Sequence, residues 1–364
     1  MNVEWAIAIA LGGAFLISAL ASPIFAAVAR KVGMVDIPAA HKAHAKVTPL
    51  LGGSGIFLAV AVCVLLAAGL VARWVDSPPG WMAESLAIHL DGAAGRLPMA
   101  LGILAVAALL HVMGLIDDAR ALGPWIKLLV QVVAAGFTSW VLGVRVMTFA
   151  GPTISIIVST LWLVVIINAM NFLDNMDGLS TGVAAIISAV LLIAAMQMQQ
   201  VFVAAWLGVL LGALLGFLPQ NFPPARMFMG DAGSLVVGYL LAVASCLTTY
   251  ATPGTEHYLY GVLVPPILLA VPLYDTASVM IIRIRAGVNP MVGDRRHFSH
   301  RLVQRGMSTP KAVLTIYLCT LATAVGALLL PHVSSLLGAA LVFGQTLSIL
   351  GVIALLESGG RRDG

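Results

Sequence analysis

The chain has 364 residues, of which 60% are hydrophobic and only 9% are charged, and its mean hydropathy is +1.03. Because soluble domains carry about 25% charged residues, the composition excludes a soluble protein and indicates an integral membrane protein. The net charge of +4 is attributed to membrane topology rather than to nucleic-acid binding. The three cysteines lie within apolar runs, so neither a disulfide framework nor a thiolate metal site is expected.

Apolar runs of about 20 residues, the length that crosses a bilayer as a helix, recur along the whole chain. The first run has no Lys or Arg before it and extends too far for a signal peptide, so it is expected to remain as the first span. The pattern predicts an all-α membrane protein that forms one domain over residues 1–364. Eleven spans are predicted, at residues 5–29, 50–72, 98–116, 125–143, 153–172, 180–199, 201–219, 233–250, 258–282, 311–330 and 333–356.

The distribution of Lys and Arg predicts the orientation of these spans. If the N-terminus is outside, 16 of the 19 basic residues fall in cytoplasmic loops or the C-terminal tail, and only Arg73, Arg96 and Arg145 fall outside. Cytoplasmic loops carry the excess of basic residues in membrane proteins, so we predict an external N-terminus and a cytoplasmic C-terminus. An error of one span in the middle would scramble this pattern, which therefore also supports the helix count.

The first two predicted cytoplasmic loops contain polar stretches of modest specificity. In "VDIPAAHKAHAKVTPLLGGSGIF", Lys46 and two histidines precede a glycine pair at a helix entry, which is also compatible with a simple loop and tight turn. In "GLIDDARALGPWIKLL", Asp117 and Asp118 end the third span, where the helix already carries partial negative charge. A nearby cation or catalytic proton would explain that pair, although a solvated loop cap explains this stretch equally well.

Asparagines and aspartates cluster at the end of the fifth predicted span, in "IINAMNFLDNMDGLSTG". Asn168, Asn171 and Asn175 share one helix face by their spacing of three and four residues. Their amides are expected to point into the bundle rather than at lipid. With Asp174 and Asp177, they predict a polar floor at the cytoplasmic boundary of the membrane.

The stretch "NFPPARMFMGDAGSLVVGYLLA" places Asp231 at the start of the eighth predicted span, among glycines. Asp231 and Ser234 fit an ordinary helix N-terminus. However, glycines permit close approach of a phosphate, and a helix N-terminus attracts anions. An aspartate there is also a suitable ligand for Mg²⁺, which binds through one or two carboxylates plus substrate phosphates.

The last long cytoplasmic loop carries "GDRRHFSHRLVQRGMS". A membrane-surface anchor would explain its arginines, such as Arg301, but not His297 and His300 at helical spacing, which suit diphosphate binding. Asp275 lies about two turns inside the ninth span, where charge is costly. We expect it to pair with an Arg or Lys from a neighbouring loop, and a direct catalytic role is the alternative. His111, in the third span, is expected to be a hydrogen-bonded core histidine.

Taken together and in this order, the five stretches resemble the polyprenyl-phosphate N-acetylhexosamine-1-phosphate transferase superfamily, which is glycosyltransferase family 4. The resemblance covers roughly residues 30–310. It implies an enzyme that moves a sugar 1-phosphate from a UDP-sugar to an undecaprenyl-phosphate-type lipid, releases UMP and needs Mg²⁺, or Mn²⁺ in its place. The implied active-site loops are residues 30–49, 117–127, 168–182, 220–234 and 283–311.

Within this superfamily, "DRRHFSHRL" resembles the histidine motif of the UDP-N-acetylglucosamine branch, Asp-x-x-His-x-His-His. The phospho-N-acetylmuramoyl-pentapeptide branch would show a run of histidines followed by Phe-Glu, which this loop lacks. Two residues depart from the family pattern: Ser299 replaces the middle histidine, and Asn175 stands where a glycine is common. The expected donor is UDP-N-acetylglucosamine, with another UDP-N-acetylhexosamine or the UDP-MurNAc-pentapeptide as alternatives.

The resemblance also implies roles for individual residues. Asp231, Asp174 and Asn171 are expected to hold the metal, and Asp231 is also counted as catalytic with Asp117 and Asp118. The latter pair is placed at the acceptor phosphate, where Asp117 is preferred for taking a proton or helping to hold the metal. The residues expected to bind the nucleotide and diphosphate are Lys46, Lys127, Asn168, Asp177, Asn221, His297, His300 and Arg301.

The expected location is the inner cell membrane, with the active site on the cytoplasmic face. The expected partners are the UDP-N-acetylhexosamine, undecaprenyl phosphate, membrane lipids and a second copy of the chain in a homodimer, without nucleic acid. A secondary transporter is the alternative from another class, since transporters place charged sites near the bilayer midplane, often in repeated halves. Here nearly every candidate residue lies at the inner edge of the membrane, with Asp275 and His111 as the exceptions, and no repeat is evident, which disfavours transport.

Overall fold

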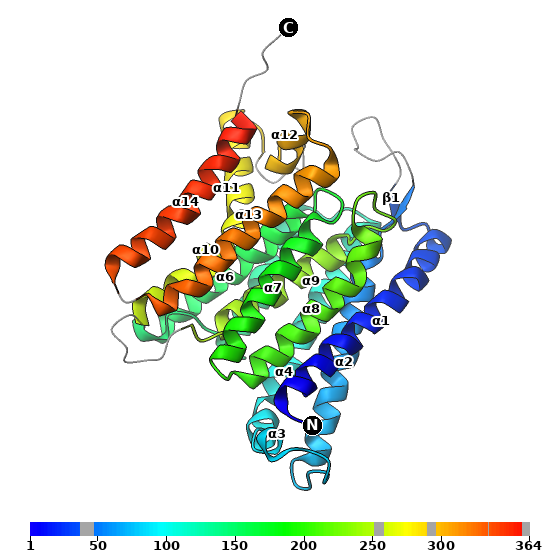
Figure 1. Cartoon of the computed structure of the whole chain (residues 1–364). Helices are drawn as coiled ribbons and strands as arrows, with labels where there is room; N and C mark the ends of the chain where they lie inside the picture. The colour runs from blue at the N-terminus through cyan, green and yellow to red at the C-terminus, as the bar shows by residue number, and fades with distance from the viewer. Residues whose placement is uncertain (37–46, 251–257, 290–295, 334, 359–364) are drawn as a thin grey trace.

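The computed structural model describes residues 1–36, 47–250, 258–289, 296–333 and 335–358, and Figure 1 shows them as a bundle of helices. Two short antiparallel strands, β1 (Val35–Asp36) and β2 (Thr48–Pro49), flank the first loop. The helices are α1 (Val3–Val32), α2 (Gly52–Trp74), α3 (Glu84–Ala87), α4 (Leu90–Ala119), α5 (Pro124–Trp140), η1 (Thr148–Ala150), α6 (Pro152–Leu173), α7 (Leu179–Gln197), α8 (Val201–Asn221), α9 (Asp231–Leu247), η2 (Tyr258–Leu263), α10 (Val264–Leu268), α11 (Ala270–Arg285), α12 (Phe298–Gln304), α13 (Thr309–Leu329), η3 (Leu330–His332) and α14 (Leu336–Ser358).

The described helices confirm an all-α membrane architecture. Each predicted span overlaps a helix, but only eight helices of the described chain are long and apolar enough to cross a membrane, or nine if one bent pair counts as a span. Helices α5 and α9, with 17 residues each, fall short of that length. The count of eleven crossings and the orientation of the termini therefore stay predictions.

The ninth predicted span, residues 258–282, is not a continuous helix. Residues Tyr260–Leu268 and Ala270–Arg285 form two segments bent by 65°. Pro265 and Pro266 lie at the start of α10 and Pro272 lies in the first turn of α11. Proline removes a backbone hydrogen bond and crowds the preceding turn, so these residues account for the break that the apolar run concealed.

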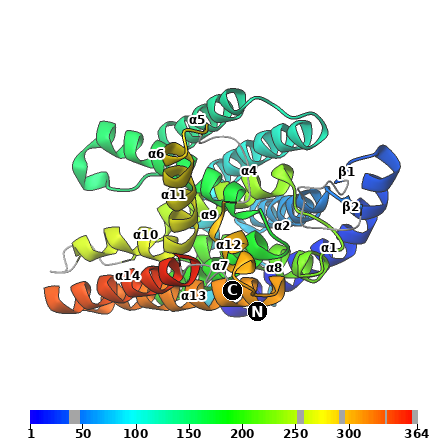
Figure 2. The same ribbon diagram turned by 90° about the horizontal axis from the view of Figure 1, so that it is seen from above.

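Helix α9 lies near the middle of the bundle, as the view from above shows (Figure 2). Every residue from Ala232 to Ser245 is buried, which fits a helix that is apolar on all sides. Glycines allow its neighbours to approach: a Cβ on Gly53 of α2 would lie 2.2 Å from the backbone nitrogen of Gly233, and a Cβ on Gly114 of α4 would lie 2.4 Å from the backbone of Ala232.

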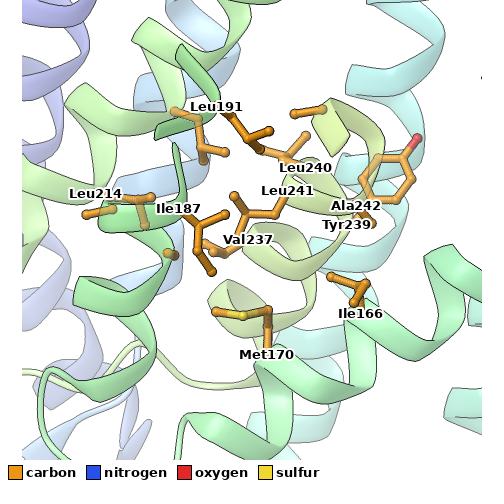
Figure 3. Packing of buried hydrophobic residues seen from close by; sticks show 14 of the residues in the cluster. Ile166, Met170, Ile187, Leu191, Leu214, Val237, Tyr239, Leu240, Leu241 and Ala242 are labelled. Carbon is orange, nitrogen blue, oxygen red and sulfur yellow. The ribbon is translucent and has the colours of Figure 1, made fainter. Parts of the chain in front are cut away.

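Side chains from α6, α7 and α8 pack against the remaining faces of α9, as Figure 3 shows around Val237 and Leu241. Helix α5 lies at one edge of the bundle (Figure 2). It exposes large apolar side chains such as Trp125, Leu129 and Trp140, as expected for a surface that faces lipid. The tightly packed centre therefore fixes the position of the α9 N-terminus, from which the site is built.

Candidate active site

Asp118, near the end of α4, holds the N-terminus of α9. Its two carboxylate oxygens accept hydrogen bonds from the backbone nitrogens of Asp231, at 2.9 Å, and Ala232, at 3.1 Å. Helix N-termini leave such N–H groups without a partner inside the helix, and the Asp118 carboxylate supplies acceptors for two of them. Gly230 makes this approach possible, because its φ is +70° and a Cβ would lie 2.6 Å from Asp118 Oδ2.

Lys127, in the first turn of α5, bridges two carboxylates that the sequence predicted to be catalytic. Its ammonium lies 2.8 Å from Asp117 Oδ2 and 2.9 Å from Asp231 Oδ2. The other oxygen of Asp117 accepts a hydrogen bond from the backbone nitrogen of Leu122 at 2.6 Å. Asp117 and Asp231 are 114 positions apart in the chain, yet both form an ion pair with Lys127.

Asn171, in the last turn of α6, completes the surroundings of Asp231. Its amide nitrogen donates to Asp231 Oδ1 and to Ser234 Oγ, each at 2.9 Å. The carboxylate of Asp231 is thus held from one side by Lys127 and from the other by Asn171. Helices α4 and α6 end, and α5 and α9 begin, at this one end of the bundle.

Asp174 follows directly after α6 and lies in a crowd of negative charge. Burial raises the pKa of its carboxyl well above the usual value, and the carboxylates of Asp231, Asp118 and Asp177 raise that pKa further. A cation placed near these groups would relieve the repulsion. The site therefore combines several carboxylates with one lysine and is electrostatically short of positive charge.

The possible metal ligands around Asp231 and Asp174 are oxygens of carboxylates and of the Asn171 amide, which suit Mg²⁺ better than a transition metal. Within the described ranges, no three His, Cys, Asp or Glu side chains gather closely enough to form a complete metal site. Mg²⁺ commonly takes only one or two carboxylates and completes its coordination with substrate phosphates and water. The donor set therefore fits a magnesium ion that binds together with a phosphorylated substrate.

Two residues expected at the nucleotide, Asp177 and Asn221, form hydrogen bonds with the loop between α8 and α9. Asp177 Oδ2 accepts a hydrogen bond from the backbone nitrogen of Ala225 at 2.9 Å, which holds the loop after α8. Asn221 is buried; its amide oxygen accepts from Thr181 Oγ1 at 2.7 Å and its amide nitrogen donates to the carbonyl of Met227 at 3.0 Å. These polar groups orient the loop that leads to α9.

Asn168 lies one turn deeper than Asn171 and is separated from the carboxylates. Its amide nitrogen donates to Gln131 Oε1 at 2.5 Å and to the carbonyl of Val164 at 2.8 Å. It joins α6 to α5 inside the bundle. Lys46, the remaining residue predicted from the first loop, lies outside the described residues.

His111 is a core histidine, as the sequence predicted. Its Nδ1 lies 3.0 Å from the carbonyl of Ala232, its Nε2 lies 3.4 Å from Ser54 Oγ, and its ring stacks on Phe57.

Two cavities at the far ends of α7 and α9 are both lined by Thr249 and Tyr250 and contain no predicted site residue. The predicted site residues in the described part of the chain lie instead near the opposite, polar end of the bundle.

The histidine stretch forms the short helix α12, whose start is bound by a buried aspartate. Asp275 Oδ2 lies 2.7 Å from His297 Nδ1, and Asp275 Oδ1 accepts from the backbone nitrogen of Phe298 at 3.0 Å. We expected Asp275 to pair with an Arg or Lys from a loop, whereas these contacts are to the histidine loop itself. His297 also lies against Phe172 at the end of α6, with ring centroids 6.1 Å apart.

Arg301 of α12 forms an ion pair that the sequence did not predict. Its Nη2 lies 2.8 Å from Glu357 Oε2 and 3.0 Å from Ser278 Oγ. The second oxygen of Glu357 accepts from the hydroxyl of Tyr274 at 2.6 Å. Glu357 is the single charged residue of α14. A lone carboxylate in an apolar helix indicates a basic partner, and this was the one feature of the sequence that pointed to the ion pair. His300, half-buried on the same helix, lies one turn after His297.

The two positions that depart from the family pattern touch each other. Ser299 Oγ donates a hydrogen bond to Asn175 Oδ1 at 2.6 Å, and the amide nitrogen of Asn175 donates to the carbonyl of Phe172 at 2.7 Å. No sequence spacing indicated this pairing, because 124 positions separate the two residues.

Comparison with known proteins assigns the class. The model of glycosyl transferase family 4 matches residues 100–249, a range that holds all the carboxylates around Lys127. The chain is 30% identical over 342 residues to the probable undecaprenyl-phosphate N-acetylglucosaminyl 1-phosphate transferase of Bacillus subtilis, with 91% of this chain and 87% of that protein covered. The chain therefore belongs to glycosyl transferase family 4.

Two further relatives carry related names. The decaprenyl-phosphate N-acetylglucosaminephosphotransferase of Mycolicibacterium smegmatis is 35% identical over 353 residues, covering 88% of this chain and 79% of that protein. The undecaprenyl-phosphate alpha-N-acetylglucosaminyl 1-phosphate transferase of Escherichia coli K12 is 26% identical over 307 residues, covering 80% and 75%. The protein is accordingly a phosphotransferase with several membrane-embedded helices.

Proposed function

We propose that the protein transfers N-acetylglucosamine 1-phosphate from UDP-N-acetylglucosamine to undecaprenyl phosphate, releases UMP, and thereby starts a lipid-linked glycan of the cell envelope. The observation that carries this proposal is the convergence of Asp117, Lys127, Asn171 and Asp231 from four helices at one end of the bundle. The names of the similar proteins from B. subtilis and E. coli support a polyprenyl phosphate as acceptor and N-acetylglucosamine as sugar.

Mg²⁺ is the proposed cofactor, and Mn²⁺ is expected to replace it. We assign the ion to the carboxylates of Asp231 and Asp174, with Asn171 beside them. The raised pKa of Asp174, caused by burial and by neighbouring carboxylates, supports a cation at this position. When bound, the ion supplies positive charge to the diphosphate and to the leaving UMP.

The reaction brings one anion to another. An oxygen of the acceptor phosphate forms a bond to the β-phosphorus of the UDP-sugar, and the bond from that phosphorus to the oxygen of UMP breaks. Such transfers depend on positioning and on stabilisation of developing negative charge. Lys127 lies between Asp117 and Asp231. We assign its ammonium to the attraction of the acceptor phosphate and Asp117 to the removal of a proton from that phosphate.

The basic residues of the histidine stretch are assigned to the other reactant. His297, His300 and Arg301 lie on or next to α12, which packs beside the end of α6 through Phe172. We assign this helix to the diphosphate of the donor and Lys46 to the same ligand. The predicted topology places this end of the bundle at the cytoplasmic face of the inner membrane, where a soluble nucleotide and a lipid acceptor can meet.

A transfer assay tests the proposal. Purified protein is incubated with undecaprenyl phosphate, Mg²⁺ and a panel of radiolabelled UDP-sugars that includes UDP-N-acetylglucosamine, other UDP-N-acetylhexosamines and the UDP-MurNAc-pentapeptide. Lipid-linked product and UMP are expected in equal amounts with UDP-N-acetylglucosamine. Turnover with another donor alone would correct the sugar, and absence of product with every UDP-sugar would overturn the proposed function.

A further inference from the structure

Polar contacts in the described part of the chain connect helix α12 to α11, to α14 and to the loop between α6 and α7. Asp275 of α11 binds its start through His297 and Phe298. Glu357 of α14 binds its last turn through Arg301. Asn175, in the loop between α6 and α7, binds its first turn through Ser299.

The connection through Asn175 differs from the other two in what it joins. Asn175 directly follows Asp174, the carboxylate crowded by Asp231 and Asp118, whereas Ser299 lies between His297 and His300. The hydrogen bond therefore runs from the carboxylate side of the site to the histidine side. The connections through Asp275 and Glu357 lead away from the carboxylates, to α11 and α14.

The surroundings of the hydrogen bond between Ser299 and Asn175 fix the orientation of both side chains. The side chain of Ser299 is fully buried, and a buried hydroxyl without a partner is costly. The amide nitrogen of Asn175 donates to the carbonyl of Phe172 at 2.7 Å, which turns the amide oxygen toward Ser299. One asparagine thus binds the end of α6 with one atom and α12 with the other.

We propose that Ser299 and Asn175 are positioning residues for the nucleotide-sugar donor: their hydrogen bond sets the spacing between the carboxylate loop and α12, between which the diphosphate is held. The inference rests on the proposed function for the identity of the donor. It adds two residues that touch neither the acceptor nor, by this assignment, the reacting atoms. They act through Asp174 on one side and through the histidines on the other.

The inference predicts different effects on the binding of the donor and of the acceptor. The acceptor side of the site is built by Asp117 and Lys127, which are held by α4, α5 and the backbone of Leu122 and do not depend on Ser299. Loss of the hydroxyl should therefore weaken donor binding and leave acceptor binding unchanged. If the hydroxyl merely stabilises the fold, its loss should weaken the binding of donor and acceptor to the same degree, or change neither.

The experiment compares Ser299→Ala with Ser188→Ala. Ser188 is equally buried, on α7, and its hydroxyl has no hydrogen-bond partner among the described residues, so the control removes the same atom without a bond. Initial rates are measured with Mg²⁺, UDP-N-acetylglucosamine and undecaprenyl phosphate. We expect Ser299→Ala to raise the KM for the UDP-sugar about five-fold, the size of effect expected for one neutral hydrogen bond, with the KM for undecaprenyl phosphate unchanged.

A double-mutant cycle tests whether the two residues act as a unit. Asn175→Ala should raise the donor KM at least as much as Ser299→Ala, because it also loses the bond to Phe172. Adding Ser299→Ala to Asn175→Ala should have no further effect, since contacting residues are not additive. Full additivity of the two changes would overturn the inference, as would equal shifts in the KM values of donor and acceptor.

Hydrogen exchange of the backbone amides gives a readout that needs no turnover. In Ser299→Ala, residues 172–178 and 297–304 should both exchange faster than in Ser188→Ala, because the connection between them is lost. Unchanged exchange in either segment would overturn the inference even if the protein is active. If the wild-type protein transfers no UDP-sugar, the proposed function fails, and exchange still decides whether this bond joins the two segments.

Discussion

The carboxylate cluster around Lys127 and the histidine helix α12 use charged residues in different ways. In the cluster, Asp117 and Asp231 share one lysine, and between 11% and 26% of each of these three side chains remains exposed. In α12, by contrast, His297 is buried against Asp275, and Arg301 is engaged by Glu357. The cluster thus retains charge that a ligand can reach, whereas much of the polarity of α12 is used to hold the helix in place.

This difference matters for how function is assigned to motif residues. A histidine or arginine in a polar loop suggests direct contact with a phosphate, but a buried ion pair already satisfies part of its hydrogen-bonding capacity. Removing one partner of such a pair leaves an uncompensated buried charge, so the main loss is stability. Substitutions in the two regions should therefore separate loss of chemistry from loss of structure.

The largest effect is expected for Asp231→Asn. The substitution keeps the shape of the side chain but removes the charge that balances Lys127 and that we assign to Mg²⁺, so turnover should fall by about 10³-fold or more. Lipid-linked product is measured at saturating substrates. Asp76→Asn, at an exposed position far from the cluster, is the matched control and should retain full activity. Comparable activity of the two variants would remove Asp231 from the catalytic machinery.

Lys127→Ala is expected to come next. Without the ammonium, Asp117 and Asp231 repel each other and the acceptor phosphate loses its attraction, so kcat/KM for undecaprenyl phosphate should fall about 10²-fold. Lys311→Ala removes an exposed lysine at the start of α13 and should leave the rate unchanged. A wild-type rate in Lys127→Ala would show that the bridge is only structural.

Asp275→Asn should act on stability more than on chemistry. Asparagine offers one acceptor oxygen in place of two, so either His297 Nδ1 or the backbone nitrogen of Phe298 loses its buried partner, at a cost of about 1–3 kcal/mol. The variant should therefore unfold at a lower temperature or denaturant concentration. The activity that remains, expressed per folded molecule, should fall far less than in Asp231→Asn. If instead turnover is abolished while the unfolding transition is unchanged, Asp275 acts on the reaction through His297 rather than on stability, and the contrast between the two regions is wrong.

The smallest expected effect is a dependence of stability on pH and Mg²⁺. The pKa of Asp174 is raised in the folded protein, by burial first and by neighbouring carboxylates second. Stability should therefore decrease as the pH rises from the unfolded pKa through the raised folded pKa. Mg²⁺ competes with the proton, so it should raise Tm more at pH 8 than at pH 6. Asp174→Asn should abolish this difference, and an equal Mg²⁺ effect at both pH values in the wild-type protein would contradict it.

Several features of the protein were predictable because they depend on short-range patterns. Apolar runs locate most helices, such as α1 and α8, since burial in a bilayer selects residues by hydropathy alone. The clusters around Asp117 and Asp231 stand out because charge is rare in such a chain. The break between α10 and α11 was missed, although Pro265 and Pro266 signalled it, because a hydropathy pattern does not register a lost backbone hydrogen bond.

The sequence by itself determined that the protein is a helical membrane protein whose acidic and basic motifs lie between its apolar runs, since composition and spacing carry that information locally. Only the tertiary structure decided which of those motif residues meet. It placed Asp118 on the backbone of α9 while its neighbour Asp117 contacts Lys127, and it joined Ser299 to Asn175 and Arg301 to Glu357. Such partners are chosen by the packing of distant helices, which glycines at close crossings permit, and no local pattern encodes them.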